Sequence, residues 1–170
     1  EAAMIWHRLD VPVIAALHGV GYGAGLQLAL GADVRIAAPG TKLAVMEMKW
    51  GIVPDMGGMV LLPRLVRSDV LRRLTYTAEP VPAEQAERWG LVTELAEDPL
   101  AAANALAATI AGKSPSAIPA AKRLITLAES GVEDAEILLA ESQEQAELMG
   151  KPHQMEVVAA EFGNRPAVFK

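Results

Sequence analysis

The sequence of 170 residues contains no cysteine and few aromatic residues. The absence of cysteine excludes disulfide bonds, thiol catalysis and cysteine-based zinc sites. It fits a reducing compartment, so we expect a cytoplasmic protein. Aromatic residues make up only 4%, so the core must consist of Ala, Leu, Val, Ile and Met. Hydrophobic residues make up 52% and charged residues 21%, which supports a folded core and excludes wholesale disorder.

Basic charge is also scarce, with 15 basic against 21 acidic residues and a net charge of −6. Phosphate binding needs clustered Lys and Arg, so we expect no nucleic-acid partner. The apolar stretch at 11–32 is long enough to span a bilayer, but its alternating glycines at 19–25 would break a membrane helix. We therefore expect no membrane span. The sequence lacks an H-x-x-x-H motif or acid cluster, so we expect no metal site.

Hydrophobic patterning divides the chain into two parts. Short apolar runs at 13–17, 34–37 and 43–46 predict buried strands, with a glycine-rich turn at 19–25, a helix at 26–30 and a loop at 47–58. Helical spacing then dominates, at 59–66, 68–76, 82–89, 100–111, 117–129, 132–149 and 152–163. Three short strands rarely complete a sheet, so we expect it to continue in residues outside this chain.

The glycine turn is the first candidate for chemistry. A strand, a glycine-rich turn and a helix together present backbone N–H groups to a ligand, which suits a phosphate or a developing oxyanion. Residues 19–24 also fit the G-x-G-x-x-G/A dinucleotide pattern. The acid expected about 20 residues later would be Glu47, but it leads into a Gly/Pro loop, which disfavours dinucleotide binding. A third interpretation is that the glycines only permit tight packing.

The glycine turn is also one of several segments that form a recognisable series. They are 12–19 (PVIAALHG), 23–30 (GAGLQLAL), 32–37 (ADVRIA), 47–54 (EMKWGIVP), 55–58 (DMGG), 86–92 (AERWGLV) and, at the end, Phe162 with 165–169 (RPAVF). In this order they resemble the crotonase (enoyl-CoA hydratase/isomerase) superfamily. Because they cover nearly the whole chain, the resemblance is far more specific than any one motif.

The resemblance implies an α/β fold, a crotonase-like spiral of β-β-α turns. Residues 1–95 would form the later part of the spiral core, and 96–170 a helical C-terminal region used in trimerisation. The N-terminal part of the family domain would lie outside this chain. The resemblance further implies an acyl-CoA thioester as the ligand and a homotrimer or dimer of trimers as the assembly. No separate cofactor is implied, because coenzyme A is part of the substrate.

The resemblance also implies a set of site residues. Two backbone N–H groups bind the thioester oxygen in this family; one matches Ala24, and the other lies on a loop of the N-terminal part. Trp50 and Tyr22 could line the acyl pocket or only pack locally. The residues expected to contact substrate are Tyr22, Gly23, Gln27, Met46 and Trp50.

The carboxylates depart from both subfamily patterns. Hydratases of the family carry a Glu one turn into the helix, where this chain has Gln27, and an amide cannot accept and return a proton. The second hydratase carboxylate matches Glu47. Dienoyl-CoA isomerases carry a further acid at the position of Asp55, eight residues later. They also carry an acid at the position of Gln27, so neither pattern is complete.

Glu47 and Asp55 together favour an enoyl-CoA isomerase, because shifting a double bond needs proton transfer but no water. One alternative is a 2-enoyl-CoA hydratase that tolerates Gln27. Another is a catalytically weak acyl-CoA-binding or assembly subunit. Each residue also has a structural interpretation: Glu47 as a surface acid at a strand end, Asp55 as a turn former after Pro54, and Gln27 as a packing amide.

Overall fold

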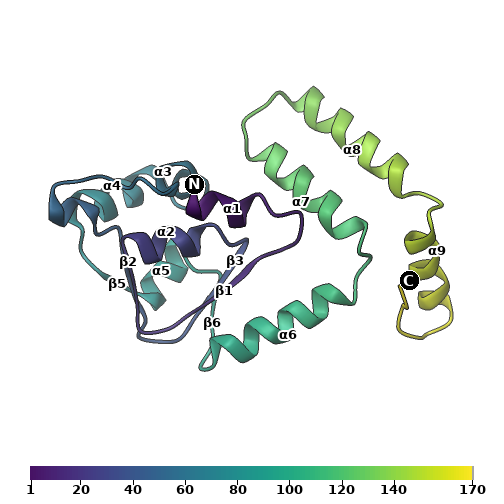
Figure 1. Cartoon of the computed structure of the whole chain (residues 1–170), viewed down its shortest axis with the longest axis horizontal. Helices are drawn as coiled ribbons and strands as arrows, with labels where there is room; N and C mark the ends of the chain where they lie inside the picture. Colours follow the sequence, from purple (N-terminus) through teal and green to yellow (C-terminus); the bar gives the residue numbers. More distant parts are fainter. Residues whose placement is uncertain (170) are drawn as a thin grey trace. The chain divides into compact units, whose positions relative to one another are not determined.

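The structure, a computed structural model, describes residues 1–169. It contains two compact units (Figure 1). The first comprises Glu1–Leu9 and Val13–Ala105, and the second comprises Asp10–Pro12 and Leu106–Lys170. All the strands of the described chain belong to the first unit.

The first unit contains two small sheets. One has the order β1-β3-β6, formed by Ile14–Leu17, Val34–Ala37 and Glu94–Leu95, with all strands parallel. The other has the order β2-β4-β5, formed by Val20–Tyr22, Lys42–Ala44 and Val81–Pro82. β2 and β4 are parallel, whereas β4 and β5 are antiparallel. The parallel pairing of Tyr22 with Ala44 brings the ends of β2 and β4 together.

The predicted strands at 13–17 and 34–37 are confirmed as β1 and β3. The glycine-rich segment at 19–25 differs from the expected turn, because Val20–Tyr22 is a strand. Gly21 explains the difference: a Cβ there would lie 2.8 Å from Cδ2 of Leu43 on the paired strand. At this position glycine permits close packing between the strands rather than a turn.

Short helices cover these sheets and contribute the core. They are α1 (Ala2–His7), α2 (Ala24–Leu30), α3 (Gly58–Leu65), α4 (Ser68–Thr77) and α5 (Ala83–Trp89). Their buried Leu, Val and Ala side chains form one cluster with those of the strands, as the scarcity of aromatics required. The first helix packs closely on α2, since a Cβ at Gly31 would overlap the carbonyl oxygen of Ala3.

Arg35 is a buried charged residue on the central strand β3 and is only 4% exposed. Its side chain donates hydrogen bonds to the carbonyl oxygens of Leu91 and Ala32. Its backbone N–H donates to the hydroxyl of Thr93. The bonds with Leu91 and Thr93 attach the segment after α5 to β3, next to the pairing of β3 with β6.

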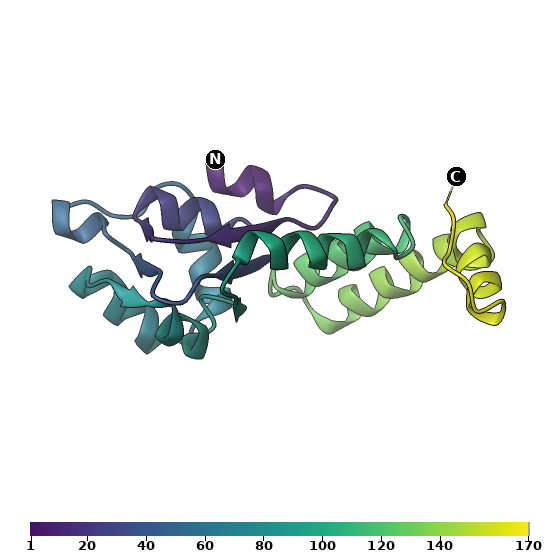
Figure 2. The ribbon, with the colours of Figure 1, turned by 90° about the horizontal axis from the view of Figure 1, so that it is seen from below.

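The second unit is helical. α6 (Pro99–Ala111) begins in the first unit and ends in the second, followed by α7 (Ala117–Ala128), α8 (Asp134–Leu148) and α9 (Pro152–Phe162). Figure 2 shows α7 and α8 side by side. Arg123 and Glu144 join them through two hydrogen bonds, Nε to Oε1 at 2.7 Å and Nη2 to Oε2 at 2.8 Å. The hydrogen bond from Arg123 lowers the pKa of the Glu144 carboxyl group.

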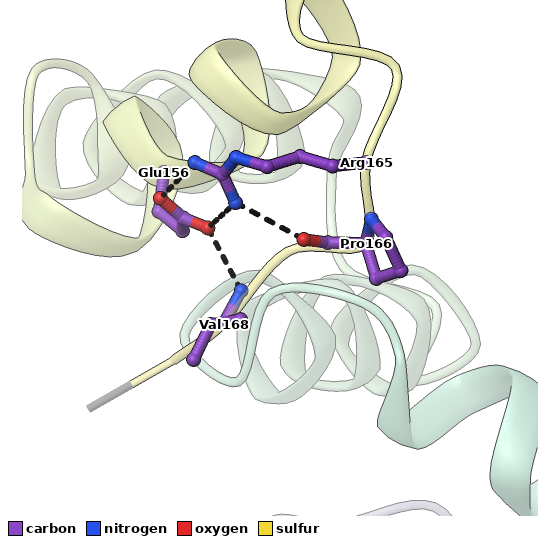
Figure 3. A network of polar contacts seen from close by, with 4 residues as sticks. All are labelled: Glu156, Arg165, Pro166 and Val168. Carbon is purple, nitrogen blue, oxygen red and sulfur yellow. Dashed lines mark hydrogen bonds and ion pairs between the residues drawn. The ribbon is translucent and has the colours of Figure 1, made fainter.

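The segment after α9 folds back onto that helix (Figure 3). Arg165 forms a bidentate ion pair with Glu156, with nitrogen–oxygen distances of 2.6 and 3.0 Å. The same carboxylate accepts the backbone N–H of Val168 at 2.8 Å. Arg165 also donates to the carbonyl oxygen of Pro166.

Within the part of the chain that the structure describes, no helix is both long and apolar enough to cross a membrane.

Candidate active site

The turn between β2 and α2 forms the backbone part of the site. Gly23 donates its N–H to the carbonyl oxygen of Ala44 at 3.0 Å, which extends the pairing of β2 with β4 by one residue. Its φ of 51° and ψ of −117° favour glycine. Ala24 follows as the first residue of α2 and is exposed. The N–H of a first helical residue has no acceptor within its own helix, so that of Ala24 is available to a ligand.

Glu47 lies next to this turn. It is the first residue of the short 3₁₀ helix η1 (Glu47–Trp50), which closely follows β4, and is 6% exposed. One carboxylate oxygen, Oε1, accepts a hydrogen bond from Nε2 of Gln27 at 2.6 Å. The other, Oε2, is buried and has no hydrogen-bond partner among residues 1–169. A Cβ at Gly23 would lie 3.4 Å from Oε1, so the turn packs directly on the carboxylate.

Gln27 connects Glu47 to a second loop. It lies one turn into α2 and is 3% exposed. Its side-chain oxygen accepts two backbone N–H groups, from Met56 at 2.9 Å and from Gly58 at 3.1 Å. The amide thus joins η1 to the loop that precedes α3 and to the first residue of that helix.

Four other predicted site residues are half-buried or exposed. Met46 and Tyr22 are half-buried, and a Cβ at Gly23 would lie 3.7 Å from that of Met46. Trp50 is 71% exposed, with Nζ of Lys49 located 5.4 Å from its ring centre. Asp55 is exposed. Gly23 and Gln27 contact the carboxylate of Glu47, and Met46 lies beside Gly23. No side-chain hydrogen bond between described residues joins Trp50 or Asp55 to that carboxylate.

The backbone N–H groups of Met56 and Gly58, which hold Gln27, were not among the predicted site groups. The available signal was the glycine pair after Met56. Gly57 adopts a φ of 108°, and a Cβ at Gly58 would lie 3.0 Å from Oε1 of Gln27. The two glycines therefore allow the loop backbone to reach the amide.

This arrangement suits one kind of chemistry. A buried carboxylate oxygen without a partner is able to take a proton from a bound ligand. When that ligand is a carbonyl compound, its oxygen becomes negative, and an available backbone N–H nearby is able to stabilise it. No cluster of three or more His, Cys, Asp or Glu side chains within the described residues is suited to a metal ion.

The fold and this site define a class, the crotonase-like α/β proteins with C-terminal helices. The sequence profile of the enoyl-CoA hydratase/isomerase family matches residues 3–169. The chain belongs to that family.

Individual relatives agree with this assignment. The carnitinyl-CoA dehydratases of Shigella flexneri and Escherichia coli K12 are 38% identical over 131 residues, which is 75% of this chain and 50% of each relative. The chain spans about half the length of these curated relatives.

Solved structures match more of the chain. An enoyl-CoA hydratase from Bacillus anthracis has a TM-score of 0.94 at 30% identity, covering 99% of this chain and 66% of that one. A structure described as a putative enoyl-CoA hydratase from Streptomyces coelicolor has a TM-score of 0.91 at 37% identity, covering 99% and 62%.

Proposed function

We propose that the protein binds an enoyl-CoA thioester and shifts its double bond through an enolate. The observation that carries this proposal is the state of Glu47, a buried carboxylate with one oxygen bound to Gln27 and the other without a partner. Such a group is able to remove a proton from a carbon next to the thioester carbonyl.

The proposed reaction has two proton transfers. Oε2 of Glu47 takes a proton from the α or γ carbon, and the electron pair of that C–H bond moves into the thioester, whose oxygen becomes negative. The N–H of Ala24 donates a hydrogen bond to that oxygen. A proton then returns to the other carbon, from Glu47 or from Asp55, and the double bond has moved. Tyr22, Met46 and Trp50 would contact the acyl chain.

Hydration is less well supported by the residues. A second carboxylate at position 27 would help Glu47 to bind water and exchange a proton with it. Gln27 does not titrate, and its oxygen already accepts two N–H groups. The observation that favours hydration or dehydration is the description of the relatives as hydratases and a dehydratase. Elimination of water also begins with removal of the α proton, so Glu47 would serve either reaction.

Nuclear magnetic resonance of a short 2-enoyl-CoA in deuterated water separates these reactions. We expect deuterium to appear on the acyl carbons without a hydroxyacyl product. Glu47 takes the γ proton, exchanges it with the solvent and returns deuterium to the α or γ carbon, and no water is added to the double bond. A 3-hydroxyacyl-CoA product would replace the isomerase proposal by hydration. Binding with neither change would contradict both enzymes and leave an acyl-CoA-binding protein.

We also propose that the second unit takes part in a homotrimer or dimer of trimers. In support, α8 has no buried residue, and Leu138 and Leu139 on it are 61% and 59% exposed. Adjacent exposed apolar side chains, on a helix that buries no residue of its own, form the kind of contiguous patch that marks an interaction site. We expect light scattering to give a trimer or a multiple of it. Leu138→Glu should reduce the molar mass of the assembly, whereas Glu147→Gln, on another face of the same helix, should not. A monomeric parent protein would contradict the proposal.

A further inference from the structure

The hydrogen bonds of Gln27 determine the orientation of its amide. Met56 and Gly58 each present a backbone N–H, which only donates, so the amide oxygen must face the loop. The amide nitrogen therefore faces Glu47, at 2.6 Å from Oε1. The protein itself thus fixes which atom of the amide meets the carboxylate.

This orientation has consequences for Glu47. Because the amide nitrogen only donates, Oε1 of Glu47 must act as an acceptor. That leaves Oε2, buried and without a partner in the described chain, as the oxygen that remains for a substrate. The amide oxygen meanwhile has both lone pairs engaged by the loop. One side chain therefore fixes both the carboxylate and the loop that follows Asp55.

We propose that Gln27 is a positioning residue, which holds Glu47 with Oε2 free to take the proton and fixes residues 56–58 behind Asp55. The inference rests on the proposed function for the role of Glu47. It differs from the substrate contact that the sequence predicts for Gln27, because most of the hydrogen-bonding capacity of the amide is used within the protein.

The variant Gln27→Met separates positioning from substrate binding. Methionine has a similar length but cannot donate to Glu47 or accept from the loop. We expect kcat for deuterium incorporation to fall about 100-fold, because a misplaced base reacts slowly. The Kd of butyryl-CoA, a saturated thioester, should stay within about twofold of the parental value, because the hydrogen bonds of Gln27 do not contribute to binding of the unreacted thioester. An unchanged kcat, or a Kd that rises as much as kcat falls, would overturn the proposal.

Gln145→Met is the matched control. Gln145 lies on α8 and is exposed, so the same chemical change there should alter neither kcat nor Kd. Thermal unfolding of both variants shows whether the folded state is retained.

A second measurement requires neither activity nor a folded Gln27→Met protein. In a ¹⁵N-labelled chain without substrate, the side-chain amide resonance of Gln27 reports the hydrogen bond to Glu47. Glu47→Gln replaces a charged acceptor by a neutral one, which weakens that bond. We expect the Gln27 resonance to shift and that of Gln145 to stay. An unmoved Gln27 resonance would overturn the positioning role, whereas failure of the proposed reaction would leave this result intact.

Discussion

Glu47→Gln is expected to reduce deuterium incorporation into a 2-enoyl-CoA by about 10²- to 10⁴-fold, the usual contribution of a general base. The change replaces an atom that takes a proton by an amide that does not. It preserves the size of the side chain, and the new amide oxygen is still able to accept the N–H of Gln27. We therefore expect the free energy of unfolding and the Kd of butyryl-CoA to change little.

Glu147→Gln provides the matched control for this prediction. Glu147 is an exposed residue of α8, and its substitution should leave the rate unchanged. If Glu47→Gln retained the parental rate, Glu47 would not be the proton carrier, and the interpretation of Glu47 as a structural acid would replace it.

Ala24→Pro is expected to slow the same reaction by about 10²- to 10³-fold, which corresponds to the loss of one oxyanion donor. Proline lacks the backbone N–H that we propose binds the thioester oxygen. The first position of a helix tolerates proline, because that N–H has no acceptor within the helix. The residue before proline must also be compatible with it. Gly23 has φ 51° and ψ −117°, and because glycine has no Cβ this conformation is sterically equivalent to its mirror image, which lies close to the extended region that residues before proline prefer.

Two controls isolate the N–H group. Ala24→Gly keeps it and should retain most of the activity. Asp134→Pro places proline at the first position of α8, after Glu133 with a ψ of 146°, and should not affect the rate. An Ala24→Pro protein that is folded and fully active would show that this N–H does not contact the developing charge.

The parts of the fold that could be predicted are those with a hydrophobic pattern within the segment itself. The apolar runs of β1 and β3 and the helical spacing beyond residue 58 are confirmed. The missed strands depend on their partners instead. Glu94–Leu95 is a strand because Ile36 and Ala37 pair with it, and two residues have no recognisable periodicity. Val20–Tyr22 requires the close approach of Gly21 to Leu43, which is set by the register of β2 with β4.

In the site, too, the sequence indicated individual residues but not the contacts that depend on folding. Gln27 and Glu47 were identified from residue types and family resemblance, and their roles in the reaction remain predictions. Their hydrogen bond was not foreseen, since it joins residues 20 positions apart through the folding of β4 beside β2. The loop N–H groups of Met56 and Gly58 were missed because main-chain donors carry no sequence signature. Only the neighbouring glycines indicated a close approach there.

The central claim is that Glu47 removes a proton next to an acyl-CoA carbonyl while the turn at Ala24 stabilises the enolate. Proton magnetic resonance of butyryl-CoA in deuterated water tests it most directly, because exchange at the α carbon requires only that step. We predict that the protein removes the α-CH₂ signal while the β-CH₂ and coenzyme A signals persist, and that the Glu47→Gln protein does not. An α signal that persists with the parent protein, or disappears equally with the variant, would contradict the account.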